Sequence, residues 1–195
     1  GGERRSYAPA GRADLALVEG TMGFYDGLGG TDRASAYAVA KLLRLPVVLA
    51  IRPKGSSLTL AAQVKGLMDF RRENQISALV LTCCTPGLHA HLKPILERET
   101  GLPVLGYLPP MAEAELPSRH LGLYTAGEVE NLQGRFTAVA EQLEKTVDLD
   151  RLLALAGGEA AEEKAISPQK PVCTIAVARD EAFCFYYPDN LEALE

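Results

Sequence analysis

The run Pro46-Val-Val-Leu-Ala-Ile51 is followed by a helical pattern over 57–73 and by a second run, Ala78-Leu-Val-Leu-Thr-Cys83. Unbroken apolar runs of this length are typical of parallel strands that helices cover on both faces. Within 57–73, apolar residues recur at the three- and four-residue spacing of an amphipathic helix, at Leu60, Val64, Leu67 and Met68. Two strands separated by a helix predict a βαβ unit, and therefore a parallel sheet.

The same alternation continues in both directions. Upstream, Asp14-Leu-Ala-Leu-Val-Glu19 predicts another strand, which a glycine-rich stretch separates from a helix over 32–44. Downstream, the pattern predicts a helix over 87–99, a strand over 104–107, and helices over 128–146 and 148–156. The expected fold class is α/β, a parallel sheet flanked by helices.

The composition changes after Gly157, which indicates a domain boundary. Residues 157–171 collect Gly, Glu, Ala, Lys, Ser and Pro, as linkers do. Beyond them, 172–178 predicts a strand and 190–195 the start of a helix, too little to bury a core. We therefore expect one domain over 1–156, truncated at its N-terminus, then this linker, and the truncated start of a second domain over 172–195.

Composition narrows the possible partners. The 195 residues include 20 Lys and Arg against 25 Asp and Glu, a net charge of −5 with no basic stripe, which argues against nucleic acid. No apolar run reaches membrane-spanning length, and the start does not resemble a signal peptide. The four cysteines follow no disulfide-framework spacing, so the expected location is the reducing cytoplasm.

Two carboxylates stand out in the glycine-rich stretch. Glu19 ends the first predicted strand, and Asp26 follows seven residues later within Gly23-Phe-Tyr-Asp-Gly27. Ligands of open parallel sheets bind beyond the carboxyl ends of the strands, and two carboxylates there can share a Mg²⁺ held by a nucleotide phosphate. An acidic turn that merely ends the strand is the alternative interpretation.

Four segments carry a resemblance to a known family. They are Ala13-Asp-Leu-Ala-Leu-Val-Glu-Gly-Thr-Met-Gly-Phe-Tyr-Asp-Gly27, Leu102-Pro-Val-Leu-Gly-Tyr-Leu-Pro109, Leu116-Pro-Ser-Arg-His-Leu-Gly-Leu123 and Asp180-Glu-Ala-Phe-Cys-Phe-Tyr-Tyr-Pro-Asp-Asn190. In this order they resemble motifs of the cobyrinic acid a,c-diamide synthases, and the last resembles the opening of the family's glutaminase domain. The matches cover essentially the whole chain.

The resemblance implies a fold and a reaction. The first domain would be P-loop NTPase-like, similar to dethiobiotin synthetase. It would use ATP and Mg²⁺ to activate the a and c acetate carboxylates of cobyrinic acid, in cobalamin biosynthesis, as acyl phosphates. Ammonia released from glutamine in a class I glutaminase domain would then displace phosphate and leave amides. Mg²⁺ would neutralise the charge that gathers on the transferred phosphoryl group.

The resemblance also assigns roles to residues. Glu19 and Asp26 match the family's catalytic and Mg²⁺-binding carboxylates, and Tyr25 and Gly27 would shape the same pocket. Three further cofactor-binding candidates are Thr59, Arg119 and His120. Thr59 would offer a hydroxyl at a helix start, where free N–H groups attract anions, although ordinary capping is an equal alternative. Arg119 and His120 would touch the nucleotide or the corrin, with surface packing as the alternative.

The chain departs from the family pattern in two parts that carry activity. No phosphate-binding loop ending in Gly-Lys-Thr occurs, so the fold is expected to lack its N-terminal phosphate-loop unit and to bind ATP poorly. The glutaminase cysteine, which lies well downstream of the Asn190 motif in the family, is also missing, and Cys184 is not its equivalent. As written, this chain would be inactive alone.

Two departures lie inside the matched region. Arg52 replaces an acidic residue, and Thr82-Cys83-Cys84 stands where the family has an asparagine expected to recognise adenine. These changes leave alternatives open: the same chemistry on siroheme or on sirohydrochlorin, including its nickel form, or a non-catalytic tetrapyrrole-binding paralogue. A homodimer is a further expectation from the family.

A metal site at the two cysteines and at His89 and His91 is a weaker hypothesis. Thiolates and imidazoles bind Zn²⁺, but adjacent side chains at a strand end point to opposite faces. We favour small buried residues next to histidines on a helix surface.

Overall fold

The computed structural model describes residues 15–115, 129–156 and 173–194, apart from 181, 184–185, 188–189 and 192–193. The helices and strands bounded below all lie in one compact unit, Glu19–Gly157. None of these helices, in the part of the chain that is described, is long and apolar enough to cross a membrane.

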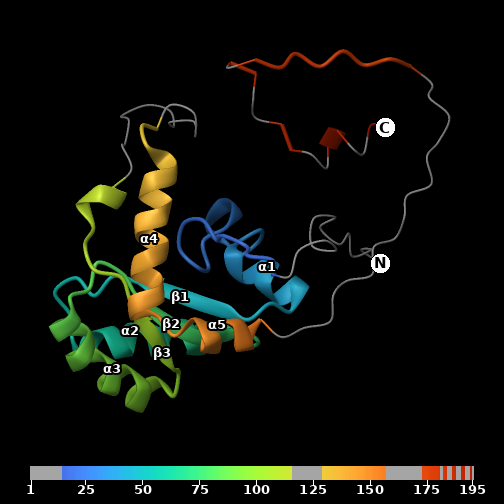
Figure 1. Ribbon diagram of the computed structural model, residues 1–195. Coiled ribbons are helices and arrows are strands. Elements are labelled where there is room, and N and C mark those ends of the chain that lie inside the picture. Colours follow the sequence, from blue (N-terminus) through green and yellow to red (C-terminus); the bar gives the residue numbers. More distant parts are fainter. Residues whose placement is uncertain are drawn as a thin grey trace. The chain divides into compact units, whose positions relative to one another are not determined.

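Within the described residues, the sheet has three parallel strands in the order β1-β2-β3 (Figure 1). They are β1 Val47–Ile51, β2 Ile76–Leu81 and β3 Val104–Tyr107. Leu49 pairs with Leu79, and Leu81 pairs with Tyr107, while the register shifts once in each strand pair, between Val47 and Val48 and between Leu79 and Val80. The predicted parallel sheet is confirmed, and β2 begins two residues earlier than the apolar run suggested.

The helices lie where the periodicity placed them. They are α1 Ala36–Leu43, α2 Leu58–Phe70, α3 Pro86–Thr100, α4 Leu132–Thr146 and α5 Leu149–Leu155, with short 3-10 turns η2 Leu28–Gly30 and η3 Ala112–Ala114. Local chemistry fixes several ends. The Ser35, Thr85 and Asp148 side chains each accept a hydrogen bond from a first-turn N–H, and Gly101 ends α3 in the left-handed region.

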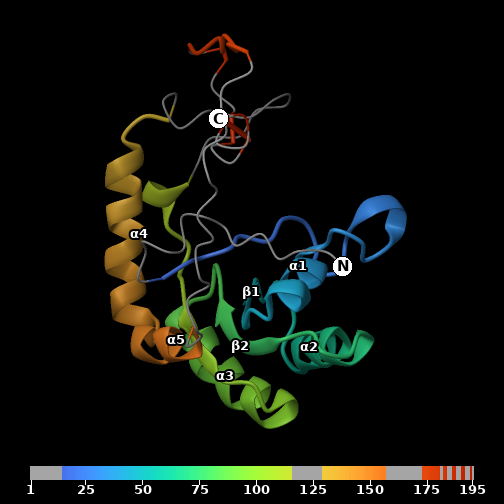
Figure 2. The same cartoon turned by 90° about the vertical axis from the view of Figure 1, so that its right-hand side faces the viewer.

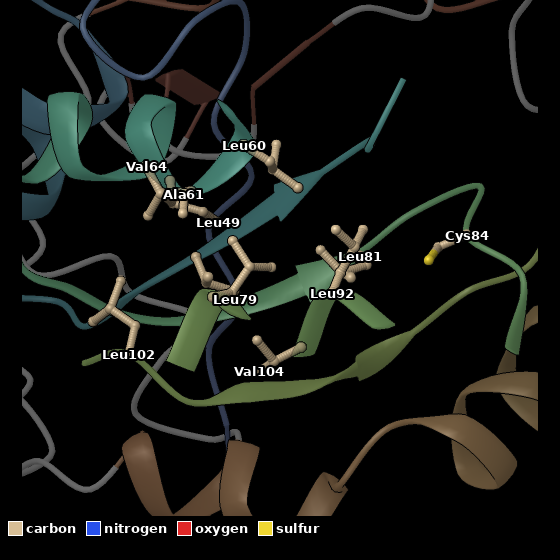
Figure 3. Packing of buried hydrophobic residues seen from close by; sticks show 11 residues of the cluster. Leu49, Leu60, Ala61, Val64, Leu79, Leu81, Cys84, Leu92, Leu102 and Val104 are labelled. Atoms are coloured by element: carbon tan, nitrogen blue, oxygen red, sulfur yellow. The ribbon is translucent and has the colours of Figure 1, made fainter. Parts of the chain in front are cut away.

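Strand alternation divides the core between the two faces of the sheet. On one face, Leu79 and Leu81 pack with α2 and α3, and Figure 3 shows Ala61 and Val64 of α2 pointing toward the sheet. On the other face, Ala78 and Val80 pack with residues of α5 and the end of α4. Helices therefore cover both faces, which explains why the strands read as continuous apolar runs.

The predicted strand at Asp14–Glu19 is wrong. The structure describes this segment from Leu15 onward, and Leu15–Gly20 are all exposed and outside any strand. A strand forms only where another supplies its hydrogen-bond partners, and none of the described strands pairs with this segment. The apolar run provides side chains suited to burial, but it has no neighbouring strand to accept its backbone hydrogen bonds.

The strand predicted over 172–178 fails for the same reason. Residues 173–179 are exposed and outside any strand, and within the described residues they have no pairing partner. The linker 157–171 lies outside the described residues, so the proposed domain boundaries stay a prediction.

Candidate functional site

The segment Gly23–Gly27 forms a tight turn that presents Asp26 to solvent. The Asp26 N–H donates to the Gly23 carbonyl at 2.9 Å, and the Gly23 N–H donates to Asp26 Oδ2 at 3.1 Å. Among the described residues, no other group bonds this carboxylate, so Oδ1 is available to a ligand. An exposed carboxylate with one fixed oxygen and one available oxygen suits a hard cation such as Mg²⁺.

Two glycines of this turn lie against other parts of it, and one of them is sterically required. A Cβ built on Gly23 would lie 2.3 Å from Asp26 Oδ2, and a Cβ on Gly27 would lie 2.1 Å from the Arg33 carbonyl oxygen. Both distances are far below any real contact, but the Asp26 side chain can rotate away from position 23, whereas the backbone beside position 27 cannot, so a side chain at Gly27 would force the turn to open. The glycines thus allow the backbone to fold back on itself around Asp26.

Tyr25 anchors the turn on α2. Its hydroxyl donates to the Leu67 carbonyl, and its ring lies 5.1 Å from the rings of both Tyr37 and Phe70. Burial, with a smaller contribution from Tyr37, raises the pKa of the Tyr25 hydroxyl, and the Arg71 guanidinium opposes this rise. The hydroxyl is therefore neutral near pH 7 and acts as a donor.

Tyr37, on α1, contacts the turn but was not among the site residues predicted from the sequence. Its N–H donates to the Phe24 carbonyl at 3.0 Å, and its hydroxyl donates to the Arg72 carbonyl at 3.1 Å. The only local signal was its place on the apolar side of the predicted helix. The partners lie too far along the chain for periodicity to reveal them.

The remaining predicted site residues are Glu19, Thr59, Arg119 and His120. Glu19 is exposed and ends no strand, so the expectation that it closes a buried strand is wrong. Thr59 is exposed in the first turn of α2, at the carboxyl edge of the sheet. Eight residues separate it from Leu67, about 12 Å along the helix axis, so the structure does not bring Tyr25 and Thr59 together. Arg119 and His120 lie outside the described residues.

A second group of polar residues lies at the carboxyl edge of the sheet. His89 stacks on Tyr107 with ring centroids 4.6 Å apart, and His91 Nε2 lies 2.9 Å from Ser57 Oγ. Burial lowers the pKa of His89 and raises that of the Cys84 thiol, whereas Cys83 is exposed. The adjacent cysteines thus have different surroundings. Within the described ranges, no three His, Cys, Asp or Glu residues gather closely enough to hold a metal ion.

The comparisons identify relatives over almost the whole chain. The chain is 44% identical over 192 residues to the cobyrinate a,c-diamide synthase of Streptococcus sanguinis, which covers 94% of the chain and 42% of the relative. It is 41% identical over 192 residues to that of Salmonella typhimurium, with the same coverage. The synthase of Clostridium tetani is 38% identical over 194 residues, which is 100% of the chain and 44% of the relative.

These relatives confirm the predicted resemblance. The chain spans about two-fifths of the length of the curated relatives that it matches. No family model matches the chain, and no solved structure gives a significant match.

Proposed function

Because the chain is homologous to a segment of the cobyrinate a,c-diamide synthases, we propose that it is part of a ligase that amidates cobyrinate. The identity of 44% over 192 residues carries this proposal. The parallel sheet with helices on both faces is compatible with the P-loop NTPase-like fold that the resemblance implies.

In the proposed reaction, an acetate carboxylate of cobyrinate becomes an amide in two steps. A carboxylate oxygen first takes the γ-phosphoryl group of ATP, which breaks the bond to ADP. Ammonia released by glutamine hydrolysis then attacks the carbonyl carbon, loses a proton, and phosphate leaves with the bonding pair. Phosphorylation is needed because an unactivated carboxylate is a poor electrophile with no good leaving group.

The Asp26 turn fits a metal-binding role in the first step. Its carboxylate is exposed, and the Gly23 N–H fixes Oδ2 and leaves Oδ1 toward solvent. When bound, Mg²⁺ supplies positive charge against the phosphates. Asp26 would hold that ion and, by its fixed position, orient the substrate carboxylate. Glu19, seven residues earlier and also exposed, is proposed as the second carboxylate.

Substitution of Asp26→Asn in the full-length protein tests this assignment. The protein is incubated with ATP, Mg²⁺, glutamine and cobyrinate, and products are followed by mass spectrometry. We expect the amidation rate to fall by about 100-fold or more with unfolding unchanged, because the amide removes the charge and keeps the shape. Asp69→Asn, at an exposed position of α2, is the matched control and should retain the wild-type rate.

The same assay separates the alternatives. Amidation of siroheme, sirohydrochlorin or its nickel form, but not of cobyrinate, would show that the amidated compound is the substrate. Tetrapyrrole binding without any ATP-dependent product would favour a non-catalytic paralogue. The residues that motivate these alternatives are Arg52, exposed beyond β1, and Cys83, exposed beyond β2.

A further inference from the structure

We propose that Tyr37 is a positioning residue that fixes the Gly23–Gly27 turn between α1 and α2, so that Asp26 is presented in one place. The inference rests on the proposed function, because it concerns how the carboxylate of that reaction is held. Tyr37 itself touches neither substrate nor metal in this proposal and acts through the turn.

The first support is that Tyr37 bonds to two separate segments. Its N–H lies in the first turn of α1, where no carbonyl within the helix can accept it, and it donates to Phe24 in the turn. Its hydroxyl donates to the Arg72 carbonyl, just beyond the end of α2. One residue, only 7% exposed, therefore bridges the turn and the end of α2.

The second support is the packing of aromatic rings around Tyr25. The Tyr25 ring lies 5.1 Å from that of Tyr37 at 54°, and 5.1 Å from that of Phe70 at 62°. The Phe24 ring lies 6.1 Å from Tyr37, at 78°. These are the tilted and edge-to-face geometries that aromatic pairs prefer. The two residues that immediately precede Asp26 are thus both held by their rings, and Phe24 is also held by its backbone carbonyl.

The third support is two ion pairs that connect α1 and the loop before it to the residues at the end of α2. Arg71 Nε lies 2.7 Å from Asp32 Oδ2, and Lys41 Nζ lies 3.0 Å from Glu73 Oε2. Figure 2 shows the blue loop region next to α1. These ion pairs and the Tyr37 contacts therefore hold the segment from the turn to α1 against the end of α2. Tyr37 is the buried residue of this group.

The position of Asp26 depends on this support because its own side chain has little else. Its Oδ2 accepts a hydrogen bond from the turn that contains it, and no other described residue forms a hydrogen bond or ion pair with the carboxylate. If the Phe24–Tyr25 pair moves, Asp26 moves with it. Misplacement of a reacting group by about 1 Å can cost about 100-fold in rate.

Two substitutions of Tyr37 in the full-length protein test the proposal. Tyr37→Leu removes the ring, whereas Tyr37→Phe keeps the ring and removes only the hydroxyl. Leu96→Ala, on α3 within the buried cluster, is a control that weakens the fold at a residue with no hydrogen bond or ring contact to the turn. Should Tyr37→Leu not fold, Phe70→Leu removes the Tyr25 contact at a position that is 57% exposed.

The readouts are steady-state amidation kinetics and hydrogen exchange of the peptide that contains residues 20–28. For Tyr37→Leu we expect kcat to fall about 10- to 100-fold, with KM for cobyrinate within about threefold and faster exchange at the Asp26 amide. Tyr37→Phe should keep most of the amidation activity and most of the protection of the turn against hydrogen exchange. Leu96→Ala should keep the wild-type kcat and the protection of the turn.

Two outcomes would overturn the proposal. One is that hydrogen exchange of the turn is as slow in Tyr37→Leu as in Leu96→Ala. The other is that exchange of the turn is faster in Tyr37→Leu while kcat is unchanged. A wild-type protein that amidates no tetrapyrrole would instead refute the proposed function. In that case the exchange comparison still decides whether Tyr37 holds the turn.

Discussion

Gly27 lies where the backbone folds closely against the carbonyl oxygens of Thr31 and Arg33. For Gly27→Ala, we expect a loss of more than about 2 kcal/mol in the free energy of unfolding, because both contacts are with backbone that cannot rotate away. Urea denaturation measures the change.

Gly66→Ala is the matched control. Gly66 lies inside α2, and a Cβ there would meet nothing within 4 Å. Alanine favours the helix over glycine, so this variant should gain about 0.5–1 kcal/mol. Equal effects of the two substitutions would show that the turn has room for a side chain.

His89 makes stability depend on pH. Burial and, to a lesser extent, Lys93 lower its pKa in the folded protein, Glu97 opposes them, and Nε2 has no hydrogen-bond partner among the described residues. The unfolded chain, with a histidine pKa of about 6.5, therefore binds the proton more readily. This contribution to stability is complete above pH 6.5 and is lost as the pH falls below it toward the folded pKa.

The comparison is urea unfolding at about pH 7.5 and 5.5, on either side of the unfolded histidine pKa. The wild-type protein should lose more stability than His89→Phe, which keeps a ring over Tyr107 but cannot be protonated. His91→Gln, at the exposed Ser57 contact, should lose as much as the wild type. An identical pH response in wild type and His89→Phe would refute the assignment.

At this scale, sequence reasoning found what is local. Tyr25, Asp26 and Gly27 are adjacent, so one motif predicted all three as candidate site residues. Tyr37 escaped because its role comes from contacts with Phe24 and Arg72, which only the fold brings close. The same holds for the stacking of His89 on Tyr107.

At the scale of elements, the sequence predicted every described strand of the sheet. Its errors were additional strands that the structure does not form. Helices satisfy their own backbone, so periodicity predicted α2 and α3 almost to their ends. The runs at 14–19 and 172–178 have equally apolar side chains, yet neither described portion has a neighbour to pair with. Apolar sequence indicates burial, and pairing depends on the rest of the molecule.

The start of α1 depends on one buried hydroxyl. Ser35 Oγ accepts a hydrogen bond from the Ala38 N–H at 3.2 Å and donates to the Asp32 carbonyl at 2.7 Å. Ser35→Ala should lose about 1–2 kcal/mol in urea unfolding, because it removes the cap on the Ala38 N–H and the hydroxyl's bond to the Asp32 carbonyl. Thr137→Ala, exposed on α4, should change stability by less than about 0.5 kcal/mol. Similar losses would contradict the capping role.

At the scale of the whole molecule, the sheet is stabilised mainly by the buried cluster under α2 and α3. Leu79 lies at the centre of that cluster and is fully buried. Leu79→Ala should lose about 2–5 kcal/mol in urea unfolding, through lost burial and the cavity left behind. Leu42→Ala, at a position 71% exposed on α1, should lose less than about 1 kcal/mol. A small loss at Leu79 would mean that the cluster does not hold the strands together.

The order of the strands followed from the sequence only in part. The βαβ pattern required parallel neighbours, and the order β1-β2-β3 is the simplest solution. The division of the core into two faces followed from alternation along β2. The short bridge that joins Gly106 of β3 to Val147 could not be foreseen, because it joins a strand to a turn between helices.

That bridge sets the direction in which the sheet can grow. Val147 bridges Gly106, and the Asp148 N–H donates to the Leu105 carbonyl, so the chain's own turn closes the outer margin of β3. The opposite margin, Val47–Ile51, pairs on its outer side with no described strand. Among the described residues, the outer backbone groups of Val47–Ile51 are therefore open to a further strand, whereas those of Leu105 and Gly106 on the opposite border already bond to the turn at 147–148.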